Sequence, residues 1–190
     1  MTEASLDSLE EPTPRGVPYD RKTMSVSEWS DDIYDAMKDW PKASRSQWEW
    51  WRPGYLVLKI TDDEGRPVEP AWIDTCDDEL TVNFGMWETH LPSPGTPVDD
   101  ELALAVAEAK QLVEDWFASR LLTVVFFKGD GKWCGSLTSL PDEVDERLAD
   151  GLDWISYSEP KRVEVRSAQR DNWRVFTVEA GNKLVEQISG

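Results

Sequence analysis

The strongest amphipathic pattern of the chain lies between residues 101 and 120. Apolar residues recur there at steps of four, three, four and three, which places them on one stripe of a helix. These residues are Leu102, Val106, Ala109, Val113 and Trp116. Thr96-Pro97-Val98-Asp99 predicts the start of this helix, because Thr is a good N-cap and Pro suits the first helical position. The following run, 121–127, is apolar on both alternating faces, which is typical of a central strand covered on both sides.

Two shorter segments also have helical spacing. Ser25-Val26-Ser27-Glu28 has the form of a capping box, and apolar residues at helical steps follow it as far as Trp40. Leu140, Val144 and Leu148 lie four residues apart and predict a short acidic helix that Gly151 ends. The tail, residues 182–188, is predicted to add a final helical turn.

The rest of the ordered chain has the patterns of strands. Alternating or β-rich runs predict strands at residues 55–61, 68–75, 79–90, 133–138, 153–158, 162–168 and 172–179. Pro70 favours an edge strand or a bulge for the second of these. Leu80, Val82 and Phe84 are expected to point inward in the third.

Together these elements predict an α+β fold. We expect a mostly antiparallel sheet of about six to seven strands, packed by one long central helix plus an N-terminal helix. Residues 1–23 contain few large apolar groups and are predicted to form a disordered N-terminal arm. Residues 24–190 are predicted to form a single α+β domain, because no linker or repeat divides them.

The charge of the chain narrows the choice of partners. It has 38 acidic and 20 basic side chains and a net charge of -18. This balance argues against binding to nucleic acid or to an anionic membrane, and it favours encounter with a basic protein. The alternative is an acidic surface that only keeps the protein dispersed.

The N-terminus does not resemble a signal peptide and no apolar run reaches membrane-span length, so we expect a cytoplasmic protein with reduced Cys76 and Cys134.

Little in the sequence indicates catalysis. His90 is the only histidine, so proton transfer near neutral pH would depend on it, with a carboxylate such as Glu88 nearby. One histidine cannot supply the paired imidazoles of most zinc sites. Asp74, Asp77, Asp78 and Glu79 make a carboxylate-rich turn, for which solvation is favoured over a calcium or magnesium site. We therefore predict no catalytic residue, no metal and no cofactor.

The densest aromatic patch is Trp48-Glu49-Trp50-Trp51. Its rings can form a wedge that holds the first helix on the sheet, or a platform on which a sugar or base stacks. Indoles and carboxylates together are typical of a protein-binding surface. The candidate partner-binding residues are Asp74, Asp77, Asp78, Trp87, Glu88, His90, Trp48 and Trp51.

The order of elements in residues 55–138 resembles that of small bacterial domains among the immunity proteins of polymorphic toxin systems. The resemblance consists of short strands ending in Glu79–His90, a long helix, a strand at Val124–Phe127 and a hairpin at Trp133-Cys134-Gly135-Ser136. It implies a cytoplasmic inhibitor that neutralises a basic toxin or enzyme, often a nuclease. Two alternatives remain: a small enzyme that uses His90 with a nearby carboxylate, and a carbohydrate or small-ligand module that uses Trp48–Trp51. The sequence makes no prediction of oligomeric state.

Overall fold

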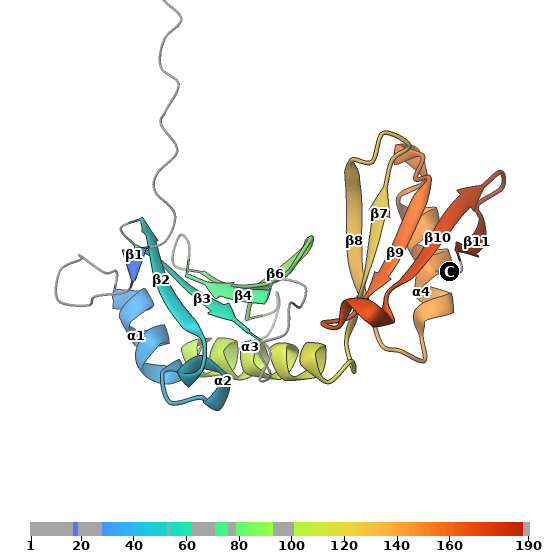
Figure 1. Ribbon diagram of the computed structural model, residues 1–190. Coiled ribbons are helices and arrows are strands. Elements are labelled where there is room, and N and C mark those ends of the chain that lie inside the picture. The colour runs from blue at the N-terminus through green and yellow to red at the C-terminus, as the bar shows by residue number, and fades with distance from the viewer. Residues whose placement is uncertain are drawn as a thin grey trace, which may run out of the picture.

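The computed structural model describes residues 17–18, 28–52, 54–61, 71–75, 79–92 and 101–187. It confirms the α+β class and the antiparallel pairing, but the prediction of one sheet is wrong. The strands form two separate antiparallel sheets, each with its own hydrophobic core (Figure 1). The long helix packs on the first sheet only.

The first sheet has the strand order β1-β2-β3-β4-β5-β6, and all neighbours are antiparallel. Three helices cover one face of it: α1 (Glu28–Met37), α2 (Pro41–Ser44) and α3 (Glu101–Phe117). Its strands are β1 (Val17–Pro18), β2 (Gln47–Arg52), β3 (Tyr55–Ile60), β4 (Ala71–Asp74), β5 (Leu80–Phe84) and β6 (Trp87–Leu91).

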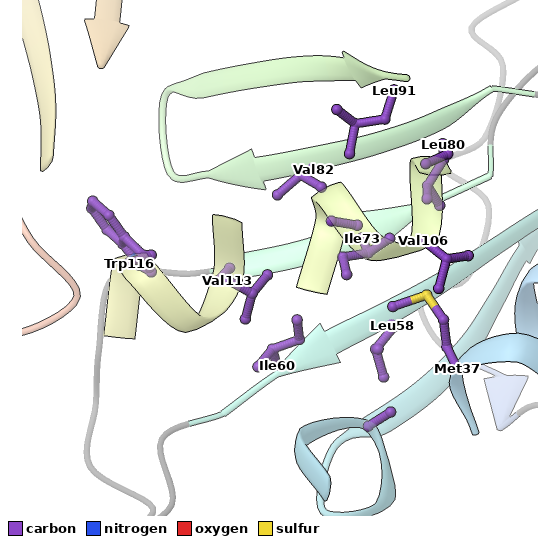
Figure 2. Close-up of a cluster of buried hydrophobic side chains, with 14 of the residues drawn as sticks. Met37, Leu58, Ile60, Ile73, Leu80, Val82, Leu91, Val106, Val113 and Trp116 are labelled. Atoms are coloured by element: carbon purple, nitrogen blue, oxygen red, sulfur yellow. The ribbon is translucent and has the colours of Figure 1, made fainter. Parts of the chain in front are cut away.

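The predicted helical stripe forms the centre of the first core. Val106, Val113 and Trp116 of α3 are buried against side chains from the strands (Figure 2). Leu80, Val82 and Phe84 point toward α3, as their alternation predicts, and the ring of Phe84 stacks on Trp116 at 4.7 Å. Burial of a large apolar side chain contributes about 1.5–3 kcal/mol, so these contacts between α3 and the strands stabilise the first sheet.

The second sheet has the strand order β11-β10-β9-β7-β8, with α4 (Val144–Trp154) packed on one face. β7 lies between β8 and β9 and is buried on both faces, which confirms the prediction of a central strand. The strands are β7 (Leu122–Phe127), β8 (Trp133–Ser139), β9 (Arg162–Arg166), β10 (Arg174–Glu179) and β11 (Lys183–Gln187). Two single-turn 3-10 helices, η2 (Ser156–Ser158) and η3 (Arg170–Asn172), connect them.

Three predictions near the C-terminus are wrong. Gly151 does not end α4 but lies buried inside it, and the predicted strand at 153–158 is the end of α4 followed by η2. A Cβ on Gly151 would overlap Cζ of Phe126, so the glycine allows the helix to approach β7. The predicted helical turn at 182–188 is β11, which pairs with β10 after a turn containing Asn182 in the left-handed region (φ 59°).

Three predictions in the first sheet also need correction. Residues 86–90 do not continue β5, because a turn at Gly85 (φ 61°) and Met86 reverses the chain into β6. Of the two alternatives for the strand with Pro70, the edge strand is wrong, because β4 lies between β3 and β5. The alternative of a bulge at Pro70 lies outside the described residues. Residues 47–52 form a strand that their pattern did not predict.

Several predictions lie largely outside the described residues. They include the capping box at 25–28, the helix start at Thr96–Asp99 and most of the predicted arm, 1–23. Of the arm, Val17 and Pro18 are described, and they pair with Trp50 and Glu49 as β1.

The two sheets meet at the β5–β6 turn. Ser136 Oγ of β8 donates a hydrogen bond to the backbone oxygen of Met86 at 2.9 Å. Leu121 and Ala168, which flank β7 and β9, pack against the first core. Figure 1 shows the β5–β6 hairpin extending toward β8.

Candidate functional site

The face of the first sheet opposite the helices carries two rows of mostly polar residues, which we call the polar face. Strand register places Glu49, Val57, Asp74, Thr81 and His90 side by side in the first row. The second row is Gln47, Lys59, Trp72, Asn83 and Glu88. Residues from five strands therefore meet on one surface, although the sequence separates them by up to about 40 positions.

One end of the polar face is internally paired. Glu49 is buried, forms an ion pair with Lys59 and accepts a hydrogen bond from Trp51 Nε1 at 3.1 Å. Burial alone would raise the pKa of Glu49, but the hydrogen bonds from Lys59 and Trp51 outweigh it and hold the pKa below its usual range. Lys59 also lies 5.7 Å from the centre of the Trp51 ring. These groups satisfy one another and leave little capacity for a ligand.

The other end of the polar face contains His90. Its Nδ1 lies 2.8 Å from Oε2 of Glu79 and 3.2 Å from Oγ1 of Thr81. Both contacts use Nδ1, so a tautomer that donates Nδ1–H to the carboxylate leaves Nε2 as a proton acceptor. This is the arrangement of an oriented general base, with Glu79 in the place that the sequence suggests for Glu88.

The hydroxyl in contact with this imidazole, Thr81 Oγ1, shares Nδ1 with Glu79 and does not lie at Nε2, where a general base would take its proton. Cys134 is partly buried against the second core, and burial raises the pKa of its thiol despite the opposing effect of Lys128. Among the described residues, no group of three or more His, Cys, Asp and Glu side chains is arranged to hold a metal ion.

The predicted partner-binding residues divide between the two faces of the first sheet. Asp74, Glu88, His90 and Trp51 belong to the polar face, where Asp74 accepts a hydrogen bond from Asn83 Nδ2 at 3.1 Å. Trp48 and Trp87 belong to the helix side. Asp77 and Asp78 lie outside the described residues.

Aromatic contacts explain the position of the two tryptophans on the helix side. Trp48 meets Tyr34 of α1 edge to face at 5.1 Å, so it acts as the predicted wedge. Trp87 stacks on Phe84 at 5.5 Å. Trp50 is buried, while Trp51 points to the opposite side of β2. The three tryptophans therefore do not form a shared stacking platform.

A second surface, which the sequence reasoning missed, lies on α4. Three aromatic side chains are the most exposed large hydrophobic groups of the described chain: Tyr157 (78%), Trp154 (60%) and Trp133 (50%). We define the α4 surface as Glu146, Asp150, Asp153, Trp154 and Tyr157, all of which are exposed. The sequence could have predicted this surface, because the apolar residues Val144, Leu148 and Leu152 lie on one side of the helix and leave the opposite side exposed to solvent.

The carboxylates of the α4 surface reduce the stability of their own helix. Glu146, Asp150 and Asp153 form no ion pair with any described residue. Glu146 and Asp150 repel each other at spacing i,i+4, and Asp150 and Asp153 lie near the helix C-terminus, where the helix dipole disfavours negative charge. Each of these effects costs about 0.2–1 kcal/mol. Folding does not explain why these charges are there.

Packing on β8 positions Trp154. A Cβ on Gly135 would overlap Cδ1 of Ile155 and lie 3.3 Å from Cζ3 of Trp154. The glycine therefore allows the end of α4 to rest on β8, with one part of the indole against the strand and the rest exposed. A ring held in this way loses little conformational entropy when a partner binds it.

Comparison with protein-family models, with curated proteins and with solved structures finds no match for this chain. None of the helices in the described residues is both long enough and apolar enough to cross a membrane.

Proposed function

We propose that this chain is a non-catalytic acidic binding protein, of the immunity or inhibitor type, that neutralises a basic toxin or enzyme in the cytoplasm. The observation that carries the proposal is the α4 surface, where unpaired carboxylates stand beside exposed aromatic rings. The carboxylates destabilise the free helix, and a cationic partner would relieve that repulsion. The free energy released by relieving this repulsion would therefore favour binding of the partner.

Charge and rings have different roles in this proposal. The net charge of -18 accelerates encounter with a basic protein from a distance, and salt screens this attraction. The rings act at contact, because aromatic side chains in a polar surround dominate interface energetics.

The test measures association of the full chain with a panel of basic ribonucleases and deoxyribonucleases at low and physiological salt. We expect nuclease inhibition and an association rate that falls steeply with salt. The Asp150→Asn/Asp153→Asn variant should slow association more than Asp32→Asn/Asp39→Asn, which removes the same charge from exposed positions of α1 and the turn after it. Absence of binding across the panel, or association that ignores salt, would contradict the proposal.

The His90–Glu79 pair supports a second candidate, a small hydrolase with His90 as general base. Hydrolysis of p-nitrophenyl acetate by the full chain, compared with free imidazole, tests it. An enzyme should exceed imidazole and lose this excess in His90→Gln at an unchanged melting temperature. A rate equal to that of imidazole would leave the binding function as the better account.

The third alternative, a carbohydrate or small-ligand module, has less support. Its proposed platform needs Trp48, Trp50 and Trp51 on one surface, but Trp48 and Trp50 face the helices.

A further inference from the structure

The chain covers many of its own aromatic rings with its own cations. Five rings of the described residues have the charged group of a Lys or Arg within 6 Å of the ring centre. The pairs are Lys42–Phe117 (4.6 Å), Lys59–Trp51 (5.7 Å), Arg162–Phe127 (4.3 Å), Arg166–Trp173 (4.5 Å) and Arg174–Phe176 (4.9 Å). Cation–π contacts therefore recur in this structure.

The most exposed rings lack such a cation. Trp133, Trp154 and Tyr157 have no Lys or Arg over them from any described residue. Trp154 differs from Trp133 because unpaired carboxylates precede it on the same helix. Glu146, Asp150 and Trp154 follow one another at steps of four and therefore lie in one line along α4.

The opposite face of the second sheet shows how a ring, a carboxylate and a guanidinium combine in this protein. Arg166 lies 4.5 Å over the ring of Trp173, while its Nε and Nη2 donate to Oε2 of Glu164 at 2.9 and 2.7 Å. A guanidinium that presents its flat face to a ring can donate its in-plane N–H groups to a carboxylate at the same time. On α4, Trp154 and Asp150 provide the ring and the carboxylate without the cation.

We propose that the α4 surface binds an arginine of the basic partner, stacked on Trp154 and hydrogen-bonded to Asp150. The inference rests on the proposed function and adds the side chain that is recognised. Arginine fits better than lysine, because only a planar guanidinium can stack on the indole and donate in its own plane at the same time. Asp150 is one helical turn from Trp154, which is within reach of one guanidinium.

The experiment uses octa-arginine and octa-lysine peptides, which have equal side-chain charge, with the full-length chain at physiological salt. Calorimetry gives the two dissociation constants, and the indole N–H resonances in NMR identify the ring that is contacted. We expect octa-arginine to bind at least about threefold more tightly and to shift the Trp154 resonance most. Trp154→Leu and Asp150→Asn should each reduce the preference for arginine to near unity.

Two control variants isolate this site. Trp133→Leu removes an exposed ring that lies outside the α4 surface, and Asp32→Asn removes an exposed charge from α1. Both should keep the preference for arginine. Trp154→Phe retains a ring against Gly135 and should keep part of the preference, so it checks that the loss in Trp154→Leu does not come from altered packing.

The outcomes separate the two proposals. Equal affinity for the two peptides, or an arginine preference that survives Trp154→Leu, would overturn the arginine site. Salt-dependent binding of a basic nuclease in the same variants would still support the proposed function. Peptide binding at Trp154 without binding to any basic nuclease would support the arginine site and count against nuclease neutralisation.

Discussion

Replacing Gly151 with Ala tests whether tertiary packing or helix propensity decides the structure of α4. Gly151 is buried in the last turn of the helix, against Phe126 of β7 and Leu137 of β8. A Cβ at this position would overlap Cζ of Phe126 and lie 2.9 Å from Cδ2 of Leu137. Phe126 is fully buried, so its ring can move only at the expense of neighbouring core side chains.

Two opposing effects set the size of the change. Ala is favoured over Gly inside a helix by about 1 kcal/mol. Overpacking a close-packed core costs about 1–3 kcal/mol, and contact with a buried ring places this site in the upper half of that range. We therefore expect Gly151→Ala to lower the free energy of unfolding by about 1–2 kcal/mol, although Ala is the better helix former.

Guanidinium unfolding followed by circular dichroism measures this difference. Ala149→Gly, at an exposed position of the same helix, calibrates the effect of propensity alone. Phe126→Leu shortens the opposing side chain, so it should cost less in the Gly151→Ala background than in the parent, with a coupling of at least about 1 kcal/mol. A Gly151→Ala protein as stable as the parent, or more stable, would refute this explanation of α4.

Three further predictions concern charged groups. Glu164→Gln removes the carboxylate charge that pairs with the buried guanidinium of Arg166 and should lower the free energy of unfolding by about 3 kcal/mol; a change below 1 kcal/mol in guanidinium unfolding would contradict this. Lys59→Met should cost about 1–3 kcal/mol at pH 7, because buried Glu49 loses its ion pair. The pKa of Glu49 is depressed in the folded state, so its contribution is complete above the unfolded value of about 4.3 and is lost as pH falls through the folded value. Urea unfolding of parent and variant should therefore converge at low pH, and a constant difference between pH 7 and pH 3 would exclude Glu49 as the cause. Asp150→Asn relieves repulsion near the end of α4 and should stabilise the protein by about 0.3–1 kcal/mol while it weakens partner binding; a loss of thermal stability would refute the dipole argument.

Local sequence patterns correctly predicted the elements in which the spacing of apolar residues by itself determines which side is buried. The steps of four and three in α3 place its apolar residues on one side, whatever that side packs against. Likewise, the alternation of Leu80, Val82 and Phe84 predicted which side of β5 is inward. Thr81 and Asn83, on the other side, are also buried, which alternation alone does not reveal.

Local signals failed where distant contacts decided the outcome. Gly151 reads as a helix end, yet the helix continues because a glycine is needed beside Phe126. The exposed tail at 183–187 becomes a strand only because β10 offers it an edge. β7 reads correctly as a central strand, but its residues do not reveal that its partners belong to a sheet other than the one under α3.

The candidate sites follow the same division. From the sequence alone came the acidic charge, the single imidazole and the absence of a recognisable catalytic motif, since these depend only on which residues are present. Tertiary structure alone paired His90 with Glu79, directed Trp48 and Trp87 into the first core, and exposed Trp154 beside unpaired carboxylates. The physical reason is that strand register and helix packing determine which side chains share a surface, and both depend on contacts between residues far apart in the chain.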